Sequence, residues 1–413
     1  MQVPIEQLLN LPDIQVLNVE ITEREIKCDI ESTRGYAICH RCGQQATKFF
    51  EHGQTLRLRH LPICEKDVYL HLRTKRYRCL DCDGRPTTTE RCEWYDADAE
   101  CTTAFAEFLL RALVNSTISD VSIKYRVPYD RVRGVLSRYV NGEVDWAQFK
   151  RLRQIGLDEI SLLKGHGDFV TIVSTRDDQG KPVVLAVLKD RKKETVASFL
   201  KSIPENLRAT VEEVCTDMYE GFINAAEEVL TQAQVVADRF HVAKLYRAAL
   251  DDLRKQEMKE LKRLLDKQEY AGLKGVLWAL RKRPADLEPE EQEVLELLFK
   301  CSRNLRQAYA LREKLTQIFE TKQSPEAARG AIRDWIIEVK RSGLDCFDKF
   351  VTTLEENMEI ITNYFTHRSN SGWVEGLNNK IKVLKRRCYG ITNPVSLFRR
   401  IWLDLSGYEA FAP

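Results

Sequence analysis

Long apolar segments are absent from this chain of 413 residues. No stretch approaches the roughly 18 uninterrupted apolar residues that a membrane-spanning helix requires, so we expect no membrane partner. The first residues, MQVPIEQLLNLPD, contain neither a basic region nor a sustained apolar run, which predicts that there is no signal peptide. We therefore expect a cytoplasmic protein.

A large excess of one charge is also absent, because the formal net charge is only +2. This value excludes a chain that is polycationic throughout, so any surface for a polyanion must be local. Two segments are locally basic. Residues 41–91 contain 11 Lys and Arg against 6 Asp and Glu, and residues 362–413 contain 8 against 3.

Cysteine, in contrast, is plentiful, with 12 in the chain. Without an export signal, this number indicates reduced thiols and metal ligands instead of a disulfide framework. Two CxxC pairs, Cys39 with Cys42 and Cys79 with Cys82, can place four thiolates around one Zn²⁺, because each two-residue spacer lets both sulfurs turn inward. We predict a structural zinc ribbon; the alternative is four unrelated thiols. Three neighbouring cysteines lack partner spacing and are expected in the core: Cys64, Cys92 and Cys101.

The 36 residues between the two cysteine pairs exceed a minimal ribbon, so they must fold by themselves. Within them, Val68–Arg78 alternates between apolar and polar side chains. Leu70 and Leu72 share one face, and the other face carries His71, Arg73 and Lys75. This alternation predicts a strand with a basic outer face, on which Arg73 and Lys75 are candidate contacts for nucleic acid.

Two short helices are expected next, at Ile118–Tyr125 and Tyr129–Tyr139. Pro128 suits the first turn of the second helix. The second helix carries three arginines that are candidate DNA contacts: Arg131, Arg133 and Arg138. The pattern favours a helix-turn-helix with a basic recognition helix, and the alternative is an ordinary helical hairpin with solvated arginines.

Beyond Trp146, strand and helix patterns follow in the order β-β-β-α-β-α-β-α, which is the order of a ribonuclease-H-like domain. Asp158 falls in the first strand and Asp217 at the end of the fourth. From His241 to about Tyr364 the pattern is almost wholly helical and predicts an all-α insertion. Its two tryptophans are expected in the core, and the alternative is that they stack on DNA: Trp278 and Trp335.

The segment Ser369–Gly390 predicts one more helix, with an apolar stripe made of Val374, Leu377, Ile381, Leu384 and Cys388. A different face starts with Glu375 and continues with Asn379, Lys382 and Arg386. A lone carboxylate followed by amide and basic side chains suits a helix that presents a metal-binding group beside a polyanion. An amphipathic helix with a basic exterior explains the same pattern.

Three carboxylates can therefore meet, because the first and fourth strands of such a sheet are neighbours and Glu375 would close over Asp158 and Asp217. They would repel one another without a cation. Oxygen ligands suit Mg²⁺ or Mn²⁺, and a pair of such ions about 4 Å apart can drive phosphoryl transfer. Other acids are weaker candidates for the same role: Glu159, Asp238, Glu355 and Glu356.

Five stretches together resemble a known family: CHRCG with YRCLDC, LDEISL, VCTDMYEGF, VVADRFHVAKL and SNSGWVEGLNNKIKVLKRRCYG. Over nearly its whole length the chain is similar to DDE transposases of bacterial insertion sequences, in the ISL-three family. The resemblance implies that Asp158, Asp217 and Glu375 form the metal-binding triad. Asp238 and His241 match an Asp-x-x-His signature of related transposases, in which the histidine is either catalytic or a hydrogen-bonded structural group.

The resemblance also implies that the zinc ribbon and helix-turn-helix recognise terminal inverted repeats of double-stranded DNA. The core would cut at those ends and join the freed 3′-hydroxyl to target DNA, with a homo-oligomer, expected as a dimer, in the synaptic complex on the nucleoid. Two alternatives remain. One is a domesticated zinc-ribbon and helix-turn-helix protein that binds DNA without catalysis, and the other is a nuclease or resolvase that cuts without strand joining.

We therefore expect a multidomain α+β protein with five parts. These are a zinc-ribbon domain (1–100), a helix-turn-helix (101–148), the first part of a ribonuclease-H-like core (149–240), an α-helical insertion (241–364) and the last part of the core with the Glu375 helix (365–413).

Overall fold

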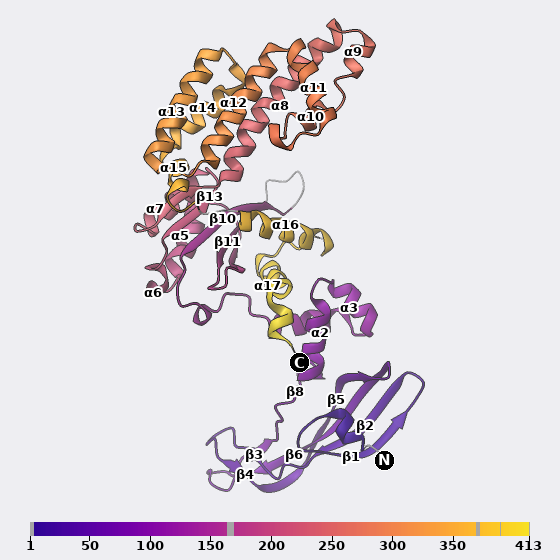
Figure 1. Ribbon diagram of the computed structural model, residues 1–413. Helices are drawn as coiled ribbons and strands as arrows, with labels where there is room; N and C mark the ends of the chain where they lie inside the picture. Colours follow the sequence, from indigo (N-terminus) through magenta and orange to yellow (C-terminus); the bar gives the residue numbers. More distant parts are fainter. Residues whose placement is uncertain (1–3, 163–168, 369–371, 389, 413) are drawn as a thin grey trace. The chain divides into compact units, whose positions relative to one another are not determined.

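The computed structural model describes residues 4–162, 169–368, 372–388 and 390–412, apart from the side chains of Gly372, Trp373 and Glu375. The chain forms two compact units (Figure 1). The first contains Met1–Gly142, Arg386–Tyr389 and Val395–Pro413, and the second contains Glu143–Lys385 and Gly390–Pro394.

A mixed sheet dominates the first unit, in the strand order β1-β2-β6-β5-β9-β8 with β7 beside β6. The strands are β1 (Ile14–Ile21), β2 (Glu25–Ser32), β5 (Lys48–Ile63), β6 (Lys66–Arg78), β7 (Thr87–Thr89), β8 (Tyr95–Asp96) and β9 (Cys101–Thr102). Helix α1 (Ile5–Leu9) precedes them, and β3 (Ala37–Ile38) pairs with β4 (Gln45–Ala46) in a small hairpin. Strands β5 and β6 form the long antiparallel hairpin that fills the space between the two cysteine pairs.

The predicted alternation along β6 is confirmed, because Val68, Leu70 and Leu72 are buried whereas Arg73 is exposed. Cys92 and Cys101 are buried as predicted. The prediction for Cys64 was wrong. This residue is exposed, with a left-handed φ of 47°, in the turn that joins β5 to β6.

Four helices complete the first unit: α2 (Thr103–Leu113), α3 (Ile118–Tyr125), α4 (Tyr129–Tyr139) and α17 (Pro394–Ala410). The hydroxyls of Thr102 and Thr117 cap α2 and α3 by accepting backbone N–H groups. Most of α17 groups with these helices, which differs from the expected part 365–413. The reason is that Leu403 lies in the same apolar cluster and that the buried Arg400 donates to carbonyls at the end of α2.

The second unit is built on a five-stranded sheet in the order β12-β11-β10-β13-β14. Its strands are β10 (Gln154–Ser161), β11 (Phe169–Arg176), β12 (Pro182–Leu188), β13 (Glu213–Thr216) and β14 (Gln234–Ala237). The first three form an antiparallel meander, and β13 lies parallel to both β10 and β14. The first and fourth strands are thus neighbours, as the sequence predicts. Helices α5 (Lys193–Ser202), α6 (Glu205–Arg208) and α7 (Glu220–Val229) connect the later strands.

A helical part leaves the sheet after β14 and returns to it. Its helices are α8 (Arg239–Leu264), α9 (Lys267–Ala271), α10 (Val276–Ala279), α11 (Pro289–Cys301), α12 (Arg303–Glu320), α13 (Pro325–Ser342), α14 (Asp348–Glu356) and α15 (Met358–His367). Three 3₁₀ turns occur in this unit, at Trp146–Gln148, Pro284–Asp286 and Asp345–Phe347. The amide of Asn363, on α15, donates to the carbonyl of Val235, on β14, so the returning chain is fastened to the strand from which it left.

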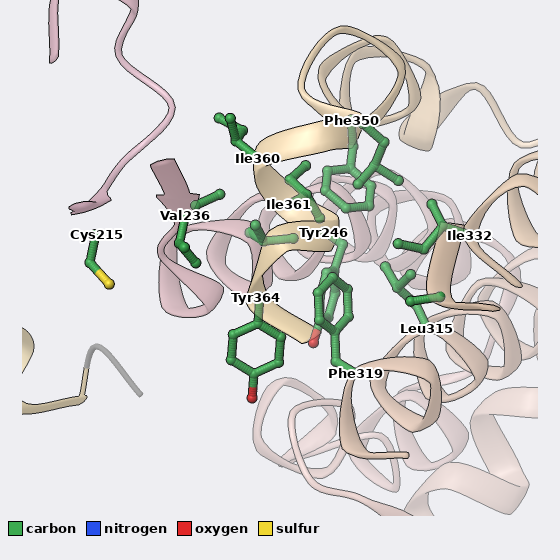
Figure 2. Close-up of a cluster of buried hydrophobic side chains, with 14 of the residues drawn as sticks. Cys215, Val236, Tyr246, Leu315, Phe319, Ile332, Phe350, Ile360, Ile361 and Tyr364 are labelled. Carbon is green, nitrogen blue, oxygen red and sulfur yellow. The ribbon is translucent and has the colours of Figure 1, made fainter. Parts of the chain in front are cut away.

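One continuous apolar core joins the sheet to the helices. Figure 2 shows side chains of α8, α12, α13, α14 and α15 gathered together, with Tyr246 and Phe350 among them. Trp335 is buried, as predicted, and its indole N–H donates to the carbonyl of Leu311. The prediction for Trp278 was wrong: its side chain is 63% exposed, because the single turn of α10 buries Val276 and Ala279 instead.

Helix α16 (Gly372–Arg387) is the last element before α17. Four of the five predicted stripe positions are buried, from Val374 to Leu384, and Cys388 is half-buried just beyond the helix. The opposite face is exposed at Asn379, Lys382 and Arg386. None of the described helices combines the length and the apolar character needed to cross a bilayer.

Candidate metal centres and nucleic-acid surfaces

The four cysteines of the CxxC pairs converge on one point. The first pair lies in a tight turn closed by a hydrogen bond from the N–H of Gly43 to the carbonyl of Cys39. A second turn begins at Cys82, whose carbonyl accepts the N–H of Arg85, and the N–H of Cys79 donates to the carbonyl of Pro86. Glycines with positive φ, Gly43 and Gly84, allow these turns. The sulfurs of Cys39 and Cys82 are 3.9 Å apart, those of Cys42 and Cys79 are 3.7 Å apart, and all four lie within 4.8 Å of one another.

These spacings fit a tetrahedral zinc ion. With Zn–S bonds of about 2.3 Å, sulfurs at the corners of a tetrahedron are about 3.8 Å apart. Backbone N–H groups of Cys42 and Arg41 lower the pKa of Cys39 to about 6, which favours the thiolate that a metal needs. The donor set therefore supports the structural zinc that the sequence predicts.

Three aspartates form a row across neighbouring strands of the second unit. In the parallel register Leu157 of β10 pairs with Thr216 of β13, and Thr216 pairs with Ala237 of β14. The next residue along each strand is an aspartate: Asp158, Asp217 and Asp238. Asp217 and Asp238 directly follow the carboxyl ends of β13 and β14, and Asp158 lies within the longer β10, level with them in the parallel register.

Hydrogen bonds fix the first two of these carboxylates. The N–H of Glu159 donates to Oδ1 of Asp158 at 2.7 Å, and the N–H of Tyr219 donates to Oδ1 of Asp217 at 3.2 Å. Burial raises the pKa of Asp158 to about 6, and the nearby Asp217 and Asp238 act in the same direction. Burial likewise raises the pKa of Asp217. Within the described residues, this cluster carries more negative charge than its surroundings neutralise, so it would gain from a bound cation.

His241 lies beside the cluster and interacts electrostatically with Asp158 and Asp217. Its Nδ1 lies 3.1 Å from Oδ2 of the buried Asp238, whose Oδ1 caps α8 by accepting the N–H of Phe240. The hydrogen bond with Asp238 raises the pKa of His241, against the effect of burial, and Asp158 and Asp217 add to the rise. The predicted signature thus forms a real contact.

Helix α16 reaches this row through a residue that the sequence reading missed. The amide nitrogen of Asn378 donates to Oδ2 of Asp158, whereas its oxygen has no partner among the described residues. Asn378 is only 3% exposed. An asparagine among the buried positions of an amphipathic helix is itself the signal, because buried polar side chains are uncommon without a specific partner. The side chain of Glu375 lies outside the described residues.

Some of the weaker carboxylate candidates lie at this site and others lie on α14. Glu159 is next to Asp158 and pairs with Arg191 at 2.8 Å. Glu355 pairs with Lys340 at 2.8 Å, and Glu356 is exposed on the same helix, α14. The fold therefore gives Glu355 a surface ion pair instead of a place in the aspartate row.

The candidate DNA contacts also differ in whether their side chains are exposed or already paired with acids of the protein. Arg73 is exposed, whereas Lys75 donates to Ser32 and pairs with Glu31 at 3.4 Å. All three arginines of α4 face acids of the same unit: Arg131 pairs with Glu100, Arg133 with Asp130, and Arg138 with Asp96 and Asp98. The three candidates on α16, Asn379, Lys382 and Arg386, are exposed to solvent.

The chain is similar to known transposases in two kinds of comparison. Residues 155–401 match the ISL3 (ISL-three) DDE family model described as "Transposase", and residues 36–82 match the "zinc-finger of transposase IS204/IS1001/IS1096/IS1165". The transposase for insertion sequence element IS1001 of Bordetella parapertussis is 27% identical over 92% of this chain and 91% of its own length. The transposase for insertion sequence element IS1557 of Mycobacterium tuberculosis is 26% identical over 91% of this chain and 87% of its own length. Because the family model covers more than half of its residues, the chain belongs to the ISL3 family of DDE transposases.

Proposed function

We propose that the chain is a metal-dependent transposase that cuts DNA at the ends of an insertion sequence and joins the freed 3′-hydroxyl to target DNA. Its catalytic part is a ribonuclease-H-like core made of β10–β14 and α16, and residues 241–364 are an insertion in that core. The observation that carries the proposal is the hydrogen bond from Asn378 to Asp158. Positions three apart on a helix share one side, so α16 can add Glu375 to the row of aspartates.

Asp158, Asp217 and Glu375 are the proposed ligands of Mg²⁺ or Mn²⁺, for which carboxylate oxygens are suitable donors. When bound, a pair of these ions activates the attacking hydroxyl and stabilises the leaving oxygen. The chain itself holds the ligands, because β10 and β13 keep two aspartates side by side and Asn378 orients one oxygen of Asp158. Asp238 holds Nδ1 of His241, which leaves Nε2 to carry a proton during the reaction.

Recognition of the element ends falls in this proposal to the zinc ribbon and to a helix-turn-helix formed by α3 and α4. The arginines of α4 would exchange their acidic partners for phosphates when DNA binds. Asn379, Lys382 and Arg386, exposed on α16, would contact the backbone near the cut. Two ends must be held together, so we propose that a dimer forms the synaptic complex.

Asp217→Asn tests the proposal. On DNA that carries the element's own terminal repeats and flanking sequence, with Mg²⁺ or Mn²⁺, wild type should produce nicks at the repeat boundary. The variant should bind with unchanged affinity and cut at least about a thousandfold more slowly, since catalytic groups act on this scale. Glu220→Gln, which neutralises an exposed acid three residues away, is the matched control and should keep cutting.

Cleavage by the Asp217→Asn protein would overturn the proposed triad. Tight binding without cleavage by wild type would favour the domesticated DNA-binding alternative. Nicks that are never followed by strand joining would favour a nuclease or resolvase.

A further inference from the structure

A concave basic surface lies on the helical part, beside the start of α8. Two adjoining hollows of about 530 Å³ and 390 Å³ share the side chains of Phe240, Arg247 and Arg281. Lys244 lines the smaller hollow, and Arg312 lines the larger one. We call the surface formed by Phe240, Lys244, Arg247 and Arg281 the α8 groove.

Around the α8 groove, the carboxylates of the described residues pair with cations, whereas three of the cations have no acidic partner. Each carboxylate that lines the two hollows already has a cation of its own within the described residues: Asp251 with Arg254, Asp286 with Arg283, Glu313 with Arg312, and Glu320 with Arg283. By contrast, the charged side-chain groups of Lys244, Arg247 and Arg281 make no ion pair or hydrogen bond within the described residues. Three cations without counter-charges, at one concave place, favour an anion as the occupant.

The groove is held in shape by its neighbours. The buried Arg312 donates to the carbonyl of Leu280 at 2.9 Å and to that of Lys282 at 2.7 Å. The hydroxyl of Tyr309 also donates to Lys282, at 3.1 Å. These bonds fix the backbone on both sides of Arg281 against α12, so Arg281 projects from an anchored segment.

Two exposed aromatic rings border the cations. Phe240 is 40% exposed and Trp278 is 63% exposed, and the guanidinium of Arg281 lies 5.3 Å from the centre of the Trp278 ring. Basic groups interleaved with exposed rings are typical of surfaces that bind unpaired nucleotides, since the rings can stack on bases.

The groove starts at the row of aspartates. Helix α8 begins at Arg239, directly after Asp238, and Lys244 and Arg247 lie six and nine residues beyond Asp238. At a rise of about 1.5 Å per residue, Arg247 is about 14 Å along the helix. One strand of duplex DNA carries a phosphate every 3.4 Å of axis and an extended unpaired strand is more widely spaced, so this distance corresponds to at most about four nucleotides.

We propose that the α8 groove binds the phosphodiester backbone of a DNA strand as it leaves the aspartate row, and that Phe240 and Trp278 stack on its unpaired bases. This inference rests on the proposed function, because it takes the aspartate row as the place of cutting. Lys244, Arg247 and Arg281 each contact a phosphate, over the first few nucleotides beyond the cut.

The test compares two triple variants in the full chain. Lys244→Ala, Arg247→Ala and Arg281→Ala together remove the groove cations. Lys259→Ala, Lys262→Ala and Lys267→Ala remove the same charge from exposed lysines of the same helical part and serve as the control. Affinity for duplex DNA that carries the element end, with an unpaired flank, is measured over a range of salt concentrations without divalent metal.

The groove triple should make the slope of log affinity against log salt less steep by about 2 to 3, because each lost phosphate contact contributes about 0.9. The control triple should keep the wild-type slope. Arg247→Lys with Arg281→Lys, which keeps both charges, should also keep it and excludes misfolding as the cause. Equal slopes for wild type and the groove triple, or equal losses in both triples, would overturn the proposal.

A second measurement separates this inference from the proposed function. A photo-crosslinking amino acid at position 244 should attach to nucleotides within about four positions of the repeat boundary, whether or not the protein cuts. Crosslinks elsewhere, or none, would overturn the groove assignment even if cleavage occurs. Crosslinks at the boundary without any cleavage would support the groove and count against the catalytic proposal.

Discussion

Each unit buries a carboxylate whose pKa is shifted, but the two pKa values are shifted in opposite directions. Burial raises the pKa of Asp67, but hydrogen bonds from Arg126 and Arg59 more than offset it and lower the value to about 2. Asp158 receives an amide and a backbone N–H instead, and its pKa is about 6. Two arginines of the same unit thus compensate the charge of Asp67, whereas burial dominates at Asp158, which is consistent with the cation that we propose for its site.

The largest effect is expected at the cysteine cluster, which, like the aspartate row, is expected to need a bound cation. We expect Cys79→Ser to abolish zinc binding and to unfold the ribbon, because structural zinc contributes about 10–16 kcal/mol of apparent binding free energy in small domains. Zinc content and hydrogen exchange of residues 36–82 are the measurements. Cys64→Ser, at an exposed thiol outside the cluster, is the control and should keep its zinc. Retention of zinc by the Cys79 variant would contradict the assignment.

Exchanging each aspartate for asparagine addresses the contrast directly. Asp67→Asn should lower the free energy of unfolding of the first unit by about 3–5 kcal/mol, because Arg59, which is 4% exposed, would lose its counter-charge. Asp158→Asn should instead raise the stability of the metal-free second unit, by up to about 3 kcal/mol, since a pKa raised by about two units marks a costly charge. Hydrogen exchange of β6 and β10 peptides reports each unit. Destabilisation by both variants would break the comparison.

The pKa values of two histidines are also shifted in opposite directions. The pKa of His241 is raised, whereas burial lowers the pKa of His60 to about 4. His60 is neutral, between the hydroxyl of Thr102 and the carbonyl of Leu9. The unfolded chain binds this proton at about pH 6.5 and the folded chain only near 4, so stability falls as pH drops through that window, by about 3 kcal/mol in all.

His60→Gln should remove this part of the pH dependence. Unfolding of the first unit by urea, compared between pH 7 and pH 4.5, should lose less stability in the variant than in wild type. Equal losses in both proteins would show that His60 does not hold the shifted pKa.

The smallest expected effect separates two adjacent asparagines of α16. Asn378→Ala should weaken activation by Mn²⁺ by about 10- to 100-fold without changing DNA affinity, which is the usual effect of removing a group that orients a metal ligand. Asn379→Ala, at the exposed neighbour, should weaken DNA binding and leave the metal response unchanged. Titrations of cleavage against Mn²⁺ and of binding against DNA distinguish the two. The reverse pattern would exchange their roles.

The features that the sequence predicts correctly are set by neighbouring residues. The CxxC spacing, the alternation of β6 and the apolar stripe of α16 each depend on a few adjacent positions. The strand order could be predicted because the strand patterns that contain Asp158 and Asp217 are well separated in the sequence and helix patterns lie between the later strands.

The features that the sequence reading missed depend on contacts between distant segments. Asn378 contacts Asp158 only because α16 lies against β10, and the sequence neighbours of Asn378 do not reveal that packing. Trp278 is exposed because other residues of a one-turn helix fill the core. Helix α17 joins α2 through Arg400 and Leu403, which no local pattern indicates.

The fastening of α15 to β14 has a consequence for how this architecture can change. The chain leaves the sheet after Ala237 and returns where Asn363 bonds Val235, so the two ends of the helical part meet at one strand. When the two ends of a segment already meet, a change in its length alters the entropic cost of loop closure only a little, because that cost grows slowly with length. Helices distant from that junction can therefore be gained, lost or replaced while the sheet keeps its register, and the helical part is the place where related enzymes can diverge without rebuilding their cores.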